Sequence, residues 1–498
     1  MKLNIISFLK KNTAKLLVLF FAFFIVFLGI WIKKTFGIQV NYIELVYSGH
    51  LALSTITTSD KSYIIEFYLR VVNLSIVSSL IFTLILEKIQ RIKMFKNYYT
   101  NLLIFNVNAY LIYGIIFFVI QFKFHELARD YVTAYVNFNN NQGLYEDPYL
   151  IDYKNPESKK NLILFYYEAL ENNIENLAKN TDLHKITNIP LSQFENPIKL
   201  VQDIKGKHIY NFKEVPTADF SIAGVISSQC SLPYYPIVSL NIHKMKDEKM
   251  FCMSDVLSAH DYEQIFYITV EKKFHGFQIF KENHKYKIHD KNIVINDFPD
   301  VEPDGWGNGV FDNDLLRHAK KEIIKLHKSN KRFNVTLINT DTHAPYIMSP
   351  KCGVSDELKT EDLRAYESYK CSSKYIRKFF DDLENEGVLE NTVVVILGDH
   401  LAYDWLSRTH RSHPSRNVFF KINTKKEFTR SKMNNFDVAP TILDEMGFFP
   451  EKQDKFGFGV SLFNKNKEFD YDKHYKSVMN KKILTNYYLK LLFKDKNI

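Results

Sequence analysis

Two side chains that commonly bind metal ions, Asp399 and His400, follow an apolar run at residues 391–397 and a glycine at position 398. The run is rich in β-branched residues, which predicts a fully buried strand of a parallel sheet. Open α/β sheets place their ligands at the carboxyl ends of such strands. Asp399 and His400 are therefore site candidates, with a simple cap at the strand end as the alternative.

A second run of the same kind covers residues 161–167 and is followed by Glu168. Parallel strands end at the same edge of a sheet, so we expect Glu168, Asp399 and His400 to lie together. Two carboxylates and an imidazole suit one divalent cation, either Mn²⁺ or Zn²⁺. The conjunction of two such strands favours a metal site over a cap.

A candidate nucleophile is Ser221, which opens a run of mostly small residues at positions 221–230 that can form a helix. A helix N-terminus and a nearby cation both favour the alkoxide that attacks phosphorus. Taken alone, a serine in this position is more often an ordinary N-cap residue.

Strand-type and helix-type segments alternate from residue 160 onwards. We expect strands at 161–167, 334–339 and 391–397, and helices near 191–203, at 314–329 and at 361–385. This alternation predicts an α/β fold with a doubly wound sheet that carries helices on both faces.

The N-terminal part of the chain resembles a membrane anchor. Charge-free apolar segments at 16–32, 71–86 and 102–122 predict a bundle of about three transmembrane helices. Lysine and arginine cluster before the first segment and between the second and third, which predicts that everything after Lys123 lies outside the cytoplasm. The alternatives are a signal peptide for the first segment and a buried soluble helix for the second.

We expect four parts: a transmembrane anchor at 1–124, an Asn-containing linker at 125–159, a catalytic domain at 160–465 and a basic tail at 466–498. The net charge of +9 is mild for 498 residues, and no arginine-rich arm is present. Attraction to anionic lipid headgroups explains this charge better than nucleic acid does. The expected partners therefore include a membrane and no nucleic acid.

All four cysteines, Cys230, Cys252, Cys352 and Cys371, lie in the part predicted to be outside the cytoplasm, and none forms a CxxC pair. An even number in an oxidising compartment predicts two disulfides. Pairing of Cys230 with Cys252 and of Cys352 with Cys371 is the simplest of the three possible connectivities. Each bond would stabilise the fold by about 3 kcal/mol in the chain-entropy model.

Four motifs occur in order along the chain: Glu168-Ala-Leu-Glu171, Ser221-Ile-Ala-Gly with Ser228-Gln-Cys230 and Pro233, Thr340-Asp-Thr-His-Ala-Pro345, and Gly398-Asp-His-Leu401. Together they resemble the membrane-anchored phosphoglycerol transferases that modify periplasmic glucans. These belong to the alkaline phosphatase/sulfatase superfamily, as do lipoteichoic acid synthases and phosphoethanolamine transferases. The resemblance covers roughly residues 160–463 and implies an alkaline-phosphatase-like fold.

The resemblance also implies roles for individual residues. Glu168, Ser221, Asp399 and His400 would hold one divalent ion, with Ser221 as the nucleophile. His343 would bind the phosphate or stabilise the leaving oxygen. Trp306 and Asp304 would contact the headgroup. His410 and His413 lie where some relatives carry a further active-site histidine, and His413 is the candidate for substrate binding.

The leading hypothesis is an enzyme that takes phosphoglycerol from phosphatidylglycerol, holds it on Ser221 and transfers it to a cell-envelope glycan hydroxyl. It would sit in a bacterial inner membrane with its catalytic domain in the periplasm. The alternative is a phosphoethanolamine transferase that acts on lipid A or a glycan. A sulfatase is disfavoured because its Cys/Ser-x-Pro-x-Arg motif does not occur at Ser221. A catalytically inactive membrane scaffold would tolerate loss of the ligand set, which is present here.

Overall fold

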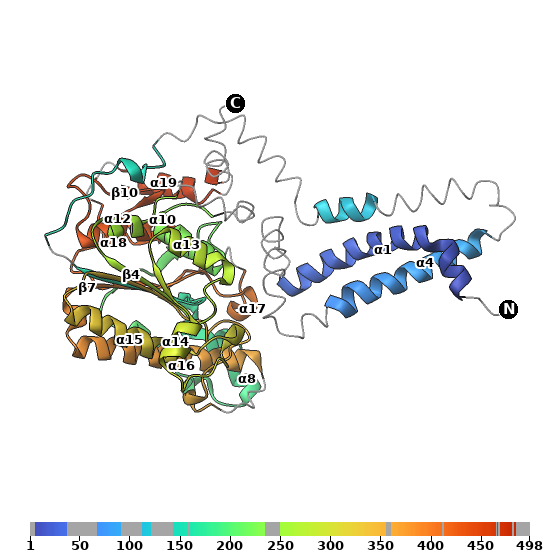
Figure 1. The fold of residues 1–498 in the computed structure, drawn as a ribbon, viewed down its shortest axis with the longest axis horizontal. Coiled ribbons are helices and arrows are strands. Elements are labelled where there is room, and N and C mark those ends of the chain that lie inside the picture. Colours follow the sequence, from blue (N-terminus) through green and yellow to red (C-terminus); the bar gives the residue numbers. More distant parts are fainter. Residues whose placement is uncertain are drawn as a thin grey trace. The chain divides into compact units, whose positions relative to one another are not determined.

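The computed structural model describes residues 5–36, 67–90, 112–120, 143–157, 160–234, 250–354, 360–410, 413–464, 466, 469–480 and 483–484. These residues divide into two compact units, Met1–Val136 and Asn137–Ile498, and each is considered by itself (Figure 1).

The N-terminal unit contains helix α1 (Ile5–Phe36), the π-helical turn Tyr68–Asn73 and helix α4 (Leu74–Gln90). Two stretches in it, Asn12–Trp31 and Tyr68–Lys88, are long and apolar enough to cross a membrane by length and composition. They coincide with the first two predicted spans. Of the third predicted span, 102–122, only residues 112–120 are described, as helix, and the rest lies outside the described residues.

The second unit is built on a seven-stranded sheet with the order β2-β8-β7-β1-β6-β4-β5. Strands β1, β4, β5, β6 and β7 pair in parallel, whereas β8 is antiparallel to β7 and β2 is antiparallel to β8. The strands are β1 (Asn161–Tyr167), β2 (Lys207–His208), β4 (Glu263–Ile268), β5 (Lys287–His289), β6 (Phe333–Ile338), β7 (Thr392–Gly398) and β8 (Phe420–Ile422). Two small sheets pair β3 (Asn211–Lys213) with β9 (Lys432–Asn434) and β10 (Lys455–Phe456) with β11 (Gly459–Val460).

Helices cover both faces of this sheet, which confirms the predicted doubly wound α/β fold (Figure 1). One face carries α10 (Ser221–Cys230), α12 (Met253–Ala259), α13 (Phe277–Asn283) and α18 (Val438–Met446). The other carries α14 (Lys291–Asp297), α15 (Asp312–Lys328) and α16 (Glu361–Asn385). The short helices are α7 (Leu177–Asn180), α8 (Leu183–Thr187), α9 (Lys199–Gln202), α17 (Asp404–Ser407) and α19 (Tyr471–Val478).

The central strand β1 shows how the two faces are built. All seven of its residues are buried, and successive side chains point to opposite faces. The Tyr166 hydroxyl lies 2.7 Å from the Ser228 hydroxyl of α10, whereas the Tyr167 hydroxyl donates to the Tyr369 carbonyl of α16 at 3.0 Å. The two neighbouring tyrosines thus anchor helices on opposite sides of the sheet.

The helix predicted near residues 191–203 is wrong as a single element. The structure has a 3₁₀ turn at Leu191–Gln193 and the one-turn helix α9. Pro197 lies between them, and its missing N–H and fixed φ break a continuous helix.

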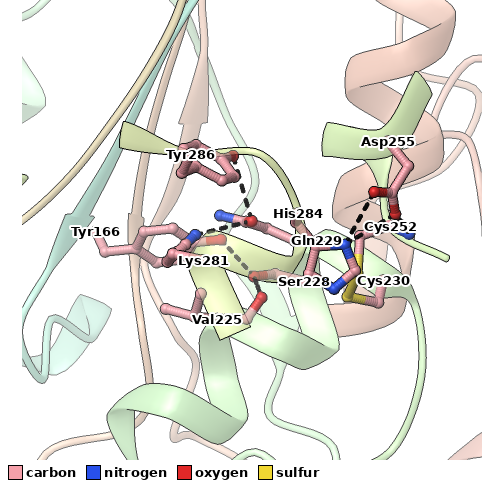
Figure 2. Close-up of a disulfide and its surroundings, with 10 residues drawn as sticks. All are labelled: Tyr166, Val225, Ser228, Gln229, Cys230, Cys252, Asp255, Lys281, His284 and Tyr286. Carbon is pink, nitrogen blue, oxygen red and sulfur yellow. Dashed lines mark hydrogen bonds and ion pairs between the residues drawn. A yellow bond between two sulfur atoms is a disulfide. The ribbon is translucent and has the colours of Figure 1, made fainter. Parts of the chain in front are cut away.

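Both disulfides have the short-range pairing, Cys230 with Cys252 and Cys352 with Cys371. The first joins the end of α10 to the start of α12 (Figure 2). The second joins the turn Pro350–Cys352 to α16. The first bond therefore fixes the far end of the helix that begins at Ser221.

Candidate metal centre and nucleophile

The register of the sheet brings the predicted ligands together. Tyr167, the last residue of β1, lies opposite Gly398, the last residue of β7. Glu168 and Asp399 follow these two residues, so the chain leaves both strands at the same point. The ligand atoms of Glu168, Asp399 and His400 lie within 4.8 Å of one another, and the three residues are 2%, 1% and 6% exposed.

Backbone hydrogen bonds aim two of these side chains. Asp399 Oδ1 accepts the N–H groups of Ala169 at 2.8 Å and His400 at 2.9 Å, which leaves Oδ2 for another ligand. The His400 Nδ1–H group donates to the Leu401 carbonyl at 2.8 Å. This bond fixes the ring so that Nε2 faces Glu168 Oε1 at 3.4 Å and Asp399 Oδ2 at 3.6 Å, as in histidines that bind metals.

Buried carboxylate oxygens converge on one point. Glu168 Oε1 and Asp399 Oδ2 have no hydrogen-bond partner within the part of the chain that the structure describes. Burial and the neighbouring Glu168 carboxylate raise the pKa of Asp399. Burial also raises the pKa of Glu168, but the charges of His400 and His343 outweigh it, so the net shift is downward. A cation at this point would favour the ionised form of Asp399 beside Glu168, so the donor set fits one divalent ion.

Ser221 is the first residue of α10 and lies beside this group. Its hydroxyl donates to Glu168 Oε2 at 3.1 Å, and its side chain does not cap the helix, because the cap position belongs to Phe220. The residue is 9% exposed. The positive end of the helix dipole and the converging ligands act on the same hydroxyl, as a nucleophile for phosphorus requires.

Gly224, one turn into α10, lets this helix approach the metal ligands closely. A Cβ at this position would lie 1.8 Å from the Asp399 carbonyl oxygen. Helix propensity alone would favour Gly224→Ala by about 1 kcal/mol. We expect the reverse: the thermal unfolding temperature should fall and metal binding should weaken, because the helix and Asp399 must separate. A more stable Gly224→Ala protein with normal metal content would contradict this packing.

His343 and Trp306 lie against each other at the edge of the site. Their ring centroids are 4.0 Å apart, and the Trp306 indole N–H donates to the Ala344 carbonyl at 2.9 Å. The His343 Nδ1–H group donates to the same carbonyl at 2.7 Å. Burial lowers the pKa of His343. The Glu168 charge opposes this effect but is weaker, so the net shift is downward. Asp304 is exposed on the loop that leads to Trp306.

A histidine that the sequence analysis missed, His275, also belongs to this region. It lies in the turn Phe274–Gly276, and its φ of 50° places it in the left-handed region. Burial and the His343 charge lower the pKa of His275 to about 3, while Glu168 opposes the shift. The Phe274 ring contacts both His275 and Trp306: its centroid lies 3.6 Å from the His275 centroid and 5.3 Å from the Trp306 centroid. A strained, non-glycine residue after a parallel strand is typical of functional sites.

His413 is not among the residues that the structure brings together here. It is exposed, and its ring is hydrogen-bonded to the Ser415 hydroxyl at 2.8 Å. The buried residue of this segment is Arg416, which donates to Glu171 at 2.8 Å and to the carbonyls of Ala402 and Thr409. Arg416 thereby closes the loop that follows Asp399 and His400.

This geometry agrees with comparisons with known proteins. Residues 221–448 match the family model described as sulfatase. The matched stretch begins at the candidate nucleophile and includes Asp399 and His400.

One curated relative is phosphoglycerol transferase I of Escherichia coli (strain 55989 / EAEC), which is 26% identical over 305 residues. The alignment covers 59% of this chain but only 38% of the relative. The family match and this relative confirm the predicted resemblance and the expectation that the chain is an enzyme.

Two solved structures are also similar. The lipoteichoic acid synthase LtaP from Listeria monocytogenes is 19% identical, with 63% of this chain and 79% of that chain covered and a TM-score of 0.49. The lipooligosaccharide phosphoethanolamine transferase A (EptA) from Neisseria meningitidis is 12% identical, with coverage of 87% and 83% and a TM-score of 0.48.

Proposed function

We propose that this protein is a metal-dependent phosphoglycerol transferase. It would take phosphoglycerol from phosphatidylglycerol and pass it, through a covalent intermediate on Ser221, to a hydroxyl of a cell-envelope glycan. The observation that carries this proposal is the Ser221 hydroxyl, which donates to Glu168 at the N-terminus of α10 beside two further ligand-type side chains. The curated relative with the name phosphoglycerol transferase I supports the choice of group.

Glu168, Ser221, Asp399 and His400 would hold one Mn²⁺ or Zn²⁺ ion. When bound, such an ion lowers the pKa of a coordinated hydroxyl and offsets phosphate charge. In the first step the Ser221 hydroxyl loses its proton as its oxygen bonds to phosphorus, the bond from phosphorus to the diacylglycerol oxygen breaks, and that oxygen takes up a proton. In the second step the acceptor hydroxyl bonds to phosphorus, loses its proton and releases Ser221.

The residues around the metal group would bind the rest of the substrate. Because Nδ1–H donates to the Ala344 carbonyl, His343 Nε2 accepts a hydrogen bond when the ring is neutral and donates one to the phosphate or the leaving oxygen when it is protonated. Trp306 offers a ring face for stacking against the glycerol, and Asp304 could accept from its hydroxyls. His413 remains a proposed contact for the acceptor, on a loop that would have to bring it closer.

We place the protein in a bacterial inner membrane with its catalytic domain in the periplasm. The two apolar helices and the two disulfides support this location. The proposed boundaries remain an anchor at 1–124, a linker at 125–159, a catalytic domain at 160–465 and a tail at 466–498. The partners would be phosphatidylglycerol, a glycan acceptor and the membrane itself.

The choice of donor can be tested directly with the full-length protein in detergent. Phosphatidylglycerol and phosphatidylethanolamine should be supplied separately, and release of diacylglycerol should be followed. We expect release from phosphatidylglycerol at a rate at least tenfold higher, because a neutral glycerol suits the Trp306 and His343 surface. Release from phosphatidylethanolamine alone would instead establish the second candidate, a phosphoethanolamine transferase that uses the exposed Asp304 carboxylate for the ammonium group.

A further inference from the structure

A buried carboxylate outside the ligand set, Asp312, receives four hydrogen bonds. Its Oδ1 accepts the backbone N–H groups of Thr340 at 3.0 Å and Asp341 at 3.2 Å. Its Oδ2 accepts the Ser372 hydroxyl at 2.8 Å and the Asn339 amide at 2.9 Å. Four donors fill the acceptor sites of one ionised carboxylate. Asp312 is fully buried and opens α15, but its side chain does not serve that helix.

The bond to Asn339 leads to a candidate metal ligand. Because the Asn339 amide nitrogen faces Asp312, its oxygen faces the other way and accepts the backbone N–H of Glu168 at 2.7 Å. The Thr342 hydroxyl donates to the Glu168 carbonyl at 3.0 Å. The peptide groups on both sides of the Glu168 side chain are therefore held by the segment that Asp312 binds.

Asp312 also belongs to the 306–312 stretch, which is attached to the 339–344 segment at both ends. Trp306, at one end of the 306–312 stretch, donates to the Ala344 carbonyl, and the Asp312 N–H, at the other end, donates to Asp341 Oδ1 at 3.2 Å. His343 lies between these two attachment points. A shift of the 306–312 stretch would therefore displace both the phosphate-binding residue and the support of Glu168.

We propose that Asp312 is a positioning residue for the metal centre: it orients the Asn339 amide and thereby holds Glu168 in place for the ion. This inference rests on the proposed function, because it assumes that Glu168 binds a metal. Ordinary helix capping does not explain Asp312, since its acceptor atoms serve Thr340 and Asp341 on a different segment.

Replacement of Asp312 by asparagine tests the hydrogen bonds from Asp312 through Asn339 to Glu168, because the two side chains have nearly the same shape. In Asp312→Asn one acceptor becomes a donor. The new NH₂ group can face the donating NH₂ group of Asn339. If Asn339 turns over to avoid this, its own NH₂ group faces the Glu168 N–H. If the new amide turns over instead, its NH₂ group faces the N–H groups of Thr340 and Asp341. Every arrangement sets donor against donor. Substitutions of groups that support a ligand typically weaken metal affinity by about 10–100-fold.

The exchange Asp312→Asn with Asn339→Asp should restore the pattern. The new amide at position 312 would donate to the new carboxylate at position 339, whose other oxygen still accepts the Glu168 N–H. The Ser372 hydroxyl can reverse its direction. A matched control is Asp314→Asn, which removes the same charge from the same helical turn, where Asp314 pairs with Lys351 at 3.1 Å.

Mn²⁺ affinity should be measured by titration calorimetry on the full-length protein in detergent, with the unfolding temperature of the metal-free form recorded in parallel. We expect Asp312→Asn to bind Mn²⁺ at least about tenfold more weakly than the wild type. The exchange variant should recover most of the lost affinity, and Asp314→Asn should bind Mn²⁺ as the wild type does. Wild-type Mn²⁺ affinity in Asp312→Asn would overturn this inference and leave the proposed function intact.

If Asp312→Asn does not fold, the exchange variant decides. Near-native affinity in it supports the inference, and a folded exchange variant without Mn²⁺ binding overturns it. A wild-type protein that binds no divalent cation would remove the proposed function together with this inference.

Discussion

Ser221→Ala should abolish phosphoglycerol transfer, with a loss of about a thousandfold or more, while the protein retains its fold. The substitution removes the atom that would bond to phosphorus and leaves Glu168, Asp399 and His400 in place. Diacylglycerol release from phosphatidylglycerol measures the activity, and metal analysis of the same preparation measures the site.

Ser221→Thr is the matched control for this prediction. It keeps the hydroxyl at the helix N-terminus, so we expect it to retain activity within about tenfold. A wild-type rate in Ser221→Ala would assign the nucleophile elsewhere, and an inactive Ser221→Thr with an active Ser221→Ala would exclude a hydroxyl at this position from the chemistry.

Asp399→Ala should lose both metal and activity while the chain still folds. The change removes the oxygen that faces His400 and Glu168, and it also removes the acceptor of the Ala169 and His400 N–H groups. Since substitutions behind a ligand already weaken affinity by about 10–100-fold, we expect loss of a ligand to exceed about a hundredfold. Metal content of the purified full-length protein, measured by elemental mass spectrometry, provides the test.

Asp381→Ala is a suitable comparison, because Asp381 lies on α16 and its carboxylate forms an ion pair with Arg377. We expect it to bind metal at the wild-type stoichiometry. Unchanged metal content in Asp399→Ala would contradict the assignment of this group as a metal centre, whatever the effect on activity.

The metal group could be predicted from the sequence because its signal is local. The runs 161–167 and 391–397 are mostly apolar, which is typical of central parallel strands, and each is followed within two residues by a ligand-type residue. The structure places these strands side by side with their last residues in register. The runs themselves do not show which strands are neighbours in the sheet. The grouping of the ligand atoms within 4.8 Å of one another therefore follows from the strand order, which only the structure provides.

His275 could not be predicted because the strand before it was not recognised. Strand β4 begins with two polar residues, Glu263 and Gln264, and only four apolar residues follow. A short run of this kind does not distinguish a strand from a buried helix. Without β4, nothing in the residue pattern places the Phe274–Gly276 turn at the carboxyl edge of the sheet.

The supporting hydrogen bonds were also beyond sequence analysis. Asn339 lies 171 residues from Glu168 and 27 residues from Asp312. The pairing of β1 with β6 brings Asn339 to Glu168, and helix α15 brings Asp312 to Asn339. Buried polar side chains carry no periodic pattern, because each is placed by its partners. The sequence therefore indicates which residues can do the chemistry, and the structure shows which residues hold them in position.

The most direct measurement is the mass of the Ser221 peptide after the full-length protein has been exposed to phosphatidylglycerol without acceptor and then quenched in acid. We predict a peptide whose mass is increased by one phosphoglycerol group, with the modification on Ser221, and its disappearance when a glycan acceptor is added before the quench. Rapid release of diacylglycerol with no modified Ser221 peptide at any time point would contradict a covalent serine intermediate.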